Sequence, residues 1–307
     1  MITILGPTAT GKTALAARLA FEMGGEVISA DSRQVYRGMD IGTGKDLGEY
    51  LVDGVAVPCH LIDIAEPGYE YNIFEYQQDF LKVYHDIVDR NRLPILCGGS
   101  GMYLEAVLKG YRLQKVRNEA DLVSDLQGKT DEELAEMLKS AKTLHNITDF
   151  ENRARLLKAI MVARSEESSM PGKVDAPGQV NPFPVISSTI IGIAFPRDMQ
   201  MARIAERLDF RLQHGMITEV EELLRQGIAP ERLMKYGLEY RYVTLFLTGK
   251  LTHAEMFFSL NIAIRQFAKR QMTWFRRMER QGMEIHWIDG RLPFENKIEQ
   301  IRFFINR

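Results

Sequence analysis

Eight residues near the start of the chain have the spacing of a loop that binds a chain of phosphates: two glycines lie five positions apart, and a lysine and a threonine follow the second. They are Gly6, Pro7, Thr8, Ala9, Thr10, Gly11, Lys12 and Thr13. An apolar run precedes them and a segment of helical character follows at 14–20, the context that this motif requires. Backbone N–H groups of such a loop converge on phosphate oxygens, Lys12 adds a positive charge, and Thr13 offers an oxygen to Mg²⁺. The loop alone leaves a kinase, an NTPase and a diphosphate-using transferase equally open.

A second glycine-rich turn, residues 98–101, follows the apolar run 93–97 and opens a helical segment at 102–108. Its glycines permit a close approach of backbone to a ligand, and the Ser100 hydroxyl could donate to a phosphate oxygen of a leaving group. The alternative is a tight turn in which Ser100 caps the following helix. The turn by itself favours neither reading, and the phosphate loop on the same sheet edge favours the first.

A carboxylate follows the apolar run 26–30, where parallel sheets gather their ligands. This residue, Asp31, could hold Mg²⁺ or accept a proton, whereas the plainer alternative makes it a helix cap. A kinase-like reading would instead use Asp63, which ends the apolar segment beginning at His60, as a metal ligand.

Short apolar runs alternate with helical segments and predict an α/β fold with a parallel, doubly wound sheet. The runs lie at 1–5, 26–30, 60–64 and 93–97, with a clear helix at 74–88 and a last strand at 188–195. Beyond residue 198 the pattern predicts helices only, including 201–212, 218–225, 241–247 and 253–280.

The late position of the last strand indicates an insertion. We predict a catalytic core formed by 1–110 and about 187–307, with a helical insertion at about 111–186. Within the insertion, the pattern predicts helices at 131–141 and 152–164, and a connecting loop at 165–184, which contains four prolines.

Bulk composition narrows the class of protein. With 307 residues, 45% of them hydrophobic, the chain can bury a sizeable core, and its net charge of −2 excludes a uniformly basic nucleic-acid binder. Two cysteines, Cys59 and Cys97, suit a reducing cytoplasm, and no apolar run approaches the length of a membrane span. We therefore expect a cytoplasmic protein without a membrane segment, and, since no dimerisation heptad is present, a monomer.

Five segments together resemble the tRNA dimethylallyltransferases, also called isopentenyltransferases. They are residues 6–13, 29–43, 60–64, 98–101 and 265–276, so that the resemblance runs almost end to end. It implies a P-loop NTPase-like sheet in which dimethylallyl diphosphate occupies the phosphate loop. The implied reaction transfers the dimethylallyl group to N6 of the adenosine at tRNA position 37, beside the anticodon, and releases diphosphate.

The resemblance also implies roles for individual residues. Asp31 would take the proton of the N6 amine, Ser100 and Arg207 would bind the diphosphate and stabilise its departure, and Lys12 and Thr13 would keep their roles with Mg²⁺ as the cofactor. Without the resemblance, Arg207 resembles a surface ion-pairing residue on a helix. The adenosine would have to be extruded from the anticodon loop to reach this site.

RNA contacts are expected from the insertion, which would hold the anticodon stem-loop, and from a basic helix containing six lysines and arginines at 261–280. The expected contact residues are Asp31, Ser32, Arg33, Gln34, Ala154, Arg155, Leu156, Leu157, Lys158, Arg241, Arg265, Lys269 and Arg270.

Some positions depart from the family pattern. Ser100 stands where bacterial members usually have threonine. Gly44 and Asp46 replace a usual alanine and a usual proline, Glu239 replaces a usual glycine, and Ile264 replaces a usual threonine. Val123 stands where the family often has an arginine. The alternatives are prenylation of free adenine nucleotides, a P-loop kinase or NTPase, and a non-catalytic RNA-binding relative. The long insertion argues against the first, and retention of Asp31, Lys12, Thr13 and Arg207 argues against the last.

Overall fold

A computed structural model describes residues 1–111, 113, 126, 128–141, 153, 156–157, 160 and 183–306. The chain divides into two compact units, one made of Met1–Tyr111 and Val185–Arg307 and the other of Arg112–Pro184. The larger unit contains the phosphate loop and every residue predicted to act on the diphosphate.

Six strands form one sheet in the larger unit, in the order β5-β2-β6-β1-β7-β8, and every neighbouring pair is parallel. The strands are β1 (Ile2–Leu5), β2 (Gly25–Ala30), β5 (Cys59–His60), β6 (Leu93–Gly98), β7 (Thr189–Ala194) and β8 (Ile285–Asp289). Because both faces of a parallel sheet are covered, its central strands are buried along their length, β1 at all four positions and β2 at all six. The predicted parallel α/β fold is confirmed. A separate hairpin pairs β3 (Leu51–Val52) with β4 (Val55–Ala56).

Two predictions about strands were wrong. The strand expected at 60–64 ends at His60, because Leu61 and Asp63 take left-handed backbone angles, with φ of 61° and 56°. The segment beyond residue 198 is not purely helical, since β8 adds an edge strand to the sheet beside β7. This strand is five residues long and only half buried, so its hydrophobic pattern is weak.

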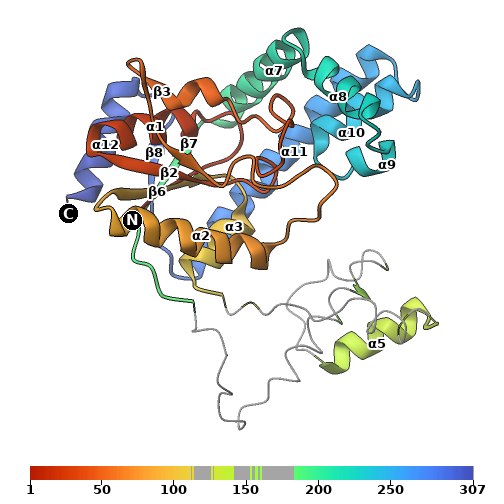
Figure 1. The fold of residues 1–307 in the computed structure, drawn as a ribbon, viewed down its shortest axis with the longest axis horizontal. Helices are drawn as coiled ribbons and strands as arrows, with labels where there is room; N and C mark the ends of the chain where they lie inside the picture. The colour runs from red at the N-terminus through yellow and green to blue at the C-terminus, as the bar shows by residue number, and fades with distance from the viewer. Residues whose placement is uncertain are drawn as a thin grey trace. The chain divides into compact units, whose positions relative to one another are not determined.

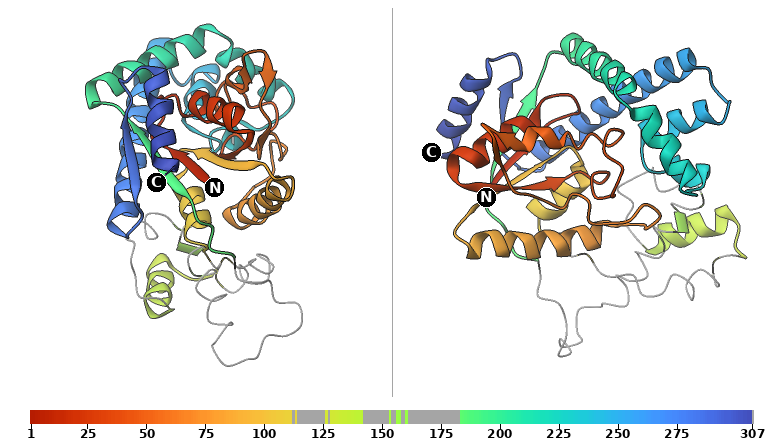
Figure 2. Two further views of the ribbon diagram at one scale, coloured as in Figure 1. Left: turned by 90° about the vertical axis from the view of Figure 1, so that its left-hand side faces the viewer. Right: turned by 45° about the horizontal axis from the view of Figure 1, so that its top comes forward.

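Helices cover both faces of the sheet (Figures 1 and 2). They are α1 (Lys12–Met23), α2 (Ile73–Asp89), α3 (Gly101–Leu108), α7 (Arg197–Gln213), α8 (Met216–Arg225), α9 (Pro230–Leu233), α10 (Leu238–Leu247), α11 (His253–Arg280) and α12 (Phe294–Ile305). Capping boxes fix where two of these helices begin: Asn72 is the N-cap of α2, and Thr252 is the N-cap of α11. None of the helices in the described part of the chain combines the length and apolar character that a bilayer crossing needs.

Two of the apolar cores in the larger unit position the site. One joins the sheet to α1 and α12, and the other joins α7, α8, α9, α10 and α11 to a loop that follows β2 and contains Val35 and Met39. The second core therefore fixes α7 and α11 against the loops at the carboxyl ends of the strands, where the site is expected.

The smaller unit contains α5 (Asp131–Ala141), as predicted, packed in a small cluster of buried leucines and one isoleucine. Leu156 is 3% exposed in this cluster, and Leu157 packs against it. Both were expected to contact RNA, and this burial contradicts the expectation, because apolar side chains inside a core are not available to a ligand. Ala154, Arg155 and Lys158 lie outside the described residues, as do Val123, most of the helix expected at 152–164 and most of the loop expected at 165–184.

Candidate active site

The phosphate loop joins β1 to α1 in the predicted way. Gly6 packs directly against β7, because a Cβ atom there would lie 2.5 Å from the carbonyl oxygen of Ile193, and Gly11 has a left-handed φ of 74°. Two side chains close the loop on its own backbone: Thr10 Oγ1 and Lys12 Nζ donate to the carbonyl oxygen of Pro7 at 2.9 and 2.8 Å. The first turn of α1 carries no acidic residue, so its N–H groups and dipole favour an anion.

A glutamine from α11 links this loop to the second glycine-rich turn. Gln271 Oε1 accepts from the backbone N–H of Thr8 at 2.9 Å, and Gln271 Nε2 donates to the carbonyl oxygen of Gly99 at 2.8 Å. The side chain is buried, and a Cβ atom at Gly99 would lie 2.5 Å from Gln271 Nε2. Sequence reasoning missed Gln271, because it lies in a helix chosen for its basic residues and pairs with a loop 263 positions away.

Asp31 and Ser100 lie side by side because β2 and β6 are neighbours, with Ala30 paired to Gly98 at their carboxyl ends. Asp31 Oδ1 accepts from the backbone N–H of Arg33 at 2.9 Å, which is a local turn and not a helix cap. Ser100 Oγ accepts from the backbone N–H of Ser32 at 3.0 Å, so the two turns are hydrogen-bonded to each other.

The alternative reading of Ser100 as the N-cap of α3 is correct for its position but not for a capping hydrogen bond. Ser100 occupies the N-cap position, but its side chain makes no capping hydrogen bond. Ser100 Oγ receives the N–H of Ser32 and donates to Ser32 Oγ at 3.4 Å, a long hydrogen bond that its hydrogen can exchange for a closer acceptor. This is the behaviour that a diphosphate-binding hydroxyl requires.

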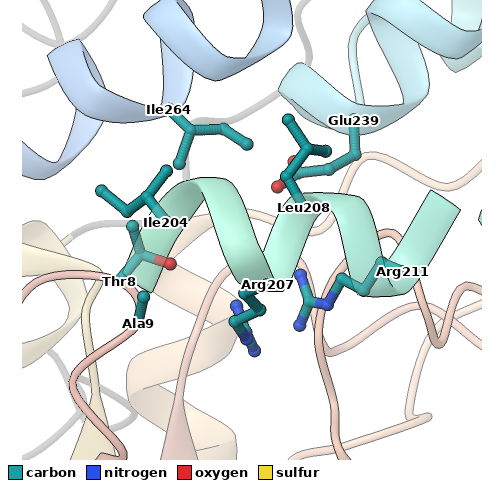
Figure 3. Close-up of a pocket in the computed structure, with 8 residues that line it drawn as sticks. All are labelled: Thr8, Ala9, Ile204, Arg207, Leu208, Arg211, Glu239 and Ile264. Carbon is teal, nitrogen blue, oxygen red and sulfur yellow. The ribbon is translucent and has the colours of Figure 1, made fainter. Parts of the chain in front are cut away.

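Arginines from α7 face the phosphate loop. Arg203 Nε donates to the carbonyl oxygen of Ala9 at 2.9 Å, and one turn later Arg207 forms an ion pair with Asp46. Arg211 Nη2 lies 3.3 Å from the same carboxylate. Figure 3 shows Arg207 and Arg211 projecting from the same side of α7, within a pocket that Thr8 and Ala9 of the loop also line. Arg207 is therefore an ion-pairing residue, but one directed toward the phosphate loop.

Electrostatics connect the predicted groups to one another. Burial lowers the pKa of the Lys12 ammonium, Arg207 lowers it further, and Asp31 acts in the opposite direction. The geometry agrees with these influences, because Arg207 lines a pocket with Thr8 and Ala9 of the loop and Asp31 lies in the turn that is hydrogen-bonded to Ser100. Two cations and a hydroxyl beside a carboxylate can neutralise a leaving diphosphate and accept a proton from an incoming amine.

Oxygen donors fit the predicted magnesium ion. Thr13 lies in the first turn of α1, and its hydroxyl hydrogen-bonds the Glu49 carboxyl, whose pKa is raised by burial and by the neighbouring Asp46. A hydroxyl and a nearby carboxylate suit a hard cation that takes its remaining ligands from phosphate and water. In the ranges that the structure describes, no three His, Cys, Asp or Glu side chains gather as a metal cage.

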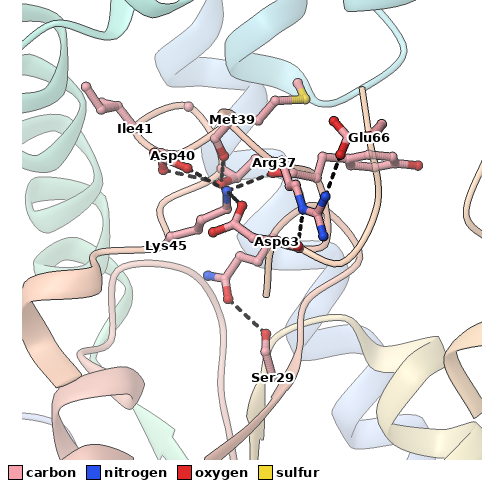
Figure 4. Close-up of polar contacts among 12 residues, drawn as sticks. Ser29, Arg37, Met39, Asp40, Ile41, Lys45, Asp63 and Glu66 are labelled. Carbon is pink, nitrogen blue, oxygen red and sulfur yellow. Dashed lines mark hydrogen bonds and ion pairs between the residues drawn. The ribbon is translucent and has the colours of Figure 1, made fainter. Parts of the chain in front are cut away.

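Asp63, the metal ligand of the kinase-like alternative, is occupied elsewhere. The fully buried ammonium of Lys45 forms ion pairs with Asp63 and, at 2.5 Å, with Asp40, and donates to the carbonyl oxygen of Tyr36 at 2.7 Å (Figure 4). Arg37 Nε binds the carbonyl oxygen of Asp63 at 2.7 Å. Asp63 thus helps to shape the loop after β2, and this geometry argues against the kinase-like alternative.

The expected RNA contacts divide into exposed and interior side chains. The exposed side chains are those of Arg33, Arg241, Lys269 and Arg270, and the half-buried ones are those of Ser32 and Arg265. Gln34 is different, because Ser29 Oγ donates to its Oε1 at 2.8 Å and its Nε2 donates to the carbonyl oxygen of Gly44 at 3.0 Å. With both ends of its amide used inside the protein, Gln34 supports the loop, and its expected side-chain contact with RNA has no geometric support.

A P-loop fold in which a carboxylate and several arginines lie beside the phosphate loop is typical of enzymes that act on phosphate esters. Comparison of the sequence and the structure with known proteins identifies the family. A family model described as IPP transferase matches residues 34–278, and a model of isopentenyl transferase matches residues 1–55. The chain belongs to the IPP transferase family.

Relatives agree with this membership. The chain is 53% identical over 306 residues to tRNA dimethylallyltransferase 1 of Parabacteroides distasonis, covering 100% of this chain and 97% of that protein. It is 52% identical over 291 residues to tRNA dimethylallyltransferase 1 of Geotalea uraniireducens, covering 94% and 92%. A solved tRNA isopentenylpyrophosphate transferase from Bacillus halodurans matches with 31% identity and a TM-score of 0.70, over 99% of this chain and 95% of that one. A solved eukaryotic dimethylallyltransferase, 21% identical, shares the fold with a TM-score of 0.77, over 100% and 80%.

Proposed function

We propose that this protein transfers a dimethylallyl group from dimethylallyl diphosphate to N6 of the adenosine at tRNA position 37 and releases diphosphate. The observation that carries the proposal is the convergence of Lys12, Ser100, Asp31 and Arg207 at the phosphate loop. Relatives that bear the name of this activity are 52% to 53% identical over nearly the whole chain.

The residues divide the work between the leaving group and the acceptor. The loop N–H groups, Lys12 and Arg207 neutralise the diphosphate, and Ser100 donates to one of its oxygens, so the allylic C–O bond breaks with its electron pair on the diphosphate. As the new C–N bond forms, Asp31 accepts the proton that N6 loses. Mg²⁺, held by Thr13 and the diphosphate, would supply further positive charge to the leaving group.

The acceptor is the part of the proposal that depends on the exposed basic side chains. Arg33 lies two residues from Asp31, and Lys269 and Arg270 are exposed on α11, which also supplies Gln271 to the loop. Such charges suit contacts to RNA phosphates around an extruded base. We further propose that the smaller unit contacts the anticodon stem-loop and that the protein acts as a monomer. We also propose that it is cytoplasmic, because its free Cys59 and Cys97 suit a reducing compartment.

Asp31→Asn tests the assignment of the base. The amide keeps an oxygen for the N–H of Arg33 but cannot accept the N6 proton, so we expect prenyl transfer to fall by about 10²- to 10⁴-fold while tRNA binding persists.

A second experiment tests the acceptor: labelled dimethylallyl diphosphate with Mg²⁺ is offered to the unaltered chain in parallel with unmodified tRNA and with AMP. Label in AMP alone would support the nucleotide acceptor, and ATP turnover without any transfer would support a kinase.

A further inference from the structure

The carboxylate of Asp46 lies where an anion contacts the arginines of α7. Arg207 forms an ion pair with it, and Arg211 Nη2 lies 3.3 Å from Oδ1 and 3.4 Å from Oδ2. Burial alone would raise the pKa of Asp46, but the two guanidinium groups hold it below its usual value. Arg207, the residue assigned to the diphosphate, therefore already contacts an anion supplied by the protein.

The backbone around Asp46 is shaped for this contact. Gly44 has a left-handed φ of 70°, and a Cβ atom there would lie 1.9 Å from Arg211 Nη2 and 2.8 Å from Arg207 Nη2. Asp46 itself has a φ of 45°, and its carbonyl oxygen accepts from the N–H of Glu49 at 2.9 Å. An incidental surface ion pair needs neither the glycine nor the left-handed turn, so the local fold is matched to two guanidinium groups at once.

The two arginines differ in their surroundings. The side chain of Arg211 is 9% exposed, and it lines a pocket together with Glu239 of α10, whose charge acts on it (Figure 3). The side chain of Arg207 is 33% exposed, and its charge is felt at Lys12 in the phosphate loop. Although Arg207 makes the closer contact with Asp46, burial restricts Arg211 to this position, and the more exposed Arg207 is the one that can turn to another anion.

We propose that Asp46 is a positioning residue that holds Arg207 until the diphosphate arrives, exchanges it for that ligand, and stays bound to Arg211. This exchange rests on the part of the proposed function that puts a diphosphate in the loop. Asp46 and the diphosphate compete for one guanidinium group, so Asp46 aligns Arg207 and lowers the affinity of the loop for free diphosphate. Arg211 retains the carboxylate after the exchange and keeps it from lying unpaired beside the phosphate.

Calorimetric titration of the full chain with inorganic pyrophosphate and Mg²⁺ tests the exchange. Asp46→Asn removes the competing charge, and we expect the Kd for pyrophosphate to fall by about 3- to 10-fold, since a partly exposed ion pair is worth roughly 1 kcal/mol. The KM for dimethylallyl diphosphate should fall by the same factor and the KM for tRNA should stay constant. Asp46→Ala removes both oxygens and carries the same expectation.

Asp53→Asn is the matched control. It makes the same change of charge seven residues later, at a carboxylate that pairs with Arg18 at 2.5 Å, and should leave the Kd for pyrophosphate within about twofold. Arg211→Gln leaves Asp46 to Arg207 alone and should weaken pyrophosphate binding. In the Asp46→Asn background the same change should have little effect, because Arg211 acts through Asp46.

A Kd that is unchanged or higher in Asp46→Asn, or that falls equally in Asp53→Asn, would overturn the exchange, and so would a loss of thermal stability with no change in Kd. Prenyl transfer to tRNA by the unaltered chain, measured in parallel, separates this failure from failure of the proposed function. Tighter pyrophosphate binding by Asp46→Asn in a chain that prenylates no tRNA would support the exchange and refute the acceptor.

Discussion

Replacing Gln271 with alanine tests whether α11 holds the phosphate loop in its working shape. The change removes the acceptor of the Thr8 N–H and the donor to the Gly99 carbonyl, which lie 2.9 and 2.8 Å from the glutamine. Each backbone group left without a partner in a buried place costs about 1 to 3 kcal/mol. Because water can reach the loop from the ligand side, we expect the free energy of unfolding to fall by about 2 to 4 kcal/mol in total.

Activity should fall with the loop's alignment. Thr8 is one of the loop residues proposed to bind the diphosphate, so a shifted backbone should lower kcat/KM for dimethylallyl diphosphate by about tenfold or more, equivalent to about 1.4 kcal/mol. Denaturant unfolding and steady-state transfer to tRNA measure the two effects. Gln271→Glu separates them, since its carboxylate still accepts from Thr8 but cannot donate to Gly99 and repels the diphosphate.

Gln266→Ala is the control, because Gln266 is an exposed glutamine on the same helix and should change neither quantity by a measurable amount. Equal stability and equal kcat/KM in Gln271→Ala and Gln266→Ala would refute the reasoning. It would mean that β1 and α1 alone determine the conformation of the loop.

Two further predictions concern Gly44 and Glu26. Gly44→Ala would place a methyl group 1.9 Å from Arg211 Nη2 in a left-handed turn, so we expect unfolding free energy to drop by about 1 to 3 kcal/mol and pyrophosphate to bind more weakly in calorimetry; unchanged values would contradict the described geometry. Hydrogen bonds from Arg90 lower the pKa of Glu26 from 4.5 to about 2, so its stabilising contribution is complete above pH 4.5 and is lost as the pH falls toward 2. The melting temperature of Glu26→Gln should therefore lie below that of the unaltered chain at pH 6 and converge with it near pH 2, whereas a constant gap would argue against a charged Glu26.

Features with a local cause were predictable from the sequence. The phosphate loop follows from eight consecutive residues, and the strands at 26–30 and 93–97 are mostly apolar because both faces of the sheet are covered. Long periodic helices such as 253–280 were predicted with the observed bounds. Asp31 and Ser100 were placed at strand ends by the same reasoning, and the neighbouring β2 and β6 bring them together.

Features that depend on distant partners were not predictable. Gln271 serves residues 8 and 99, and Asp46 meets arginines more than 160 positions later, so neither contact leaves a mark in its local sequence. Leu156 and Leu157 were assigned to RNA from a motif, but their burial depends on α5 and its neighbours. The side-chain amide of Gln34 was likewise assigned without knowledge that Ser29 and Gly44 would use both of its ends.

The separation of the site residues along the chain has a consequence for synthesis. A growing chain that has reached residue 184 has made the phosphate loop, Asp31 and Ser100, but it still lacks the sheet neighbour β7, the arginines of α7 and Gln271. The loop's amide at Thr8 and the carbonyl of Gly99 then have no internal partner, and β1 presents an unpaired edge where β7 will add. The site can therefore form only after Gln271 has emerged from the ribosome. A chain that terminates before this residue would have a phosphate loop without the hydrogen bonds of Gln271.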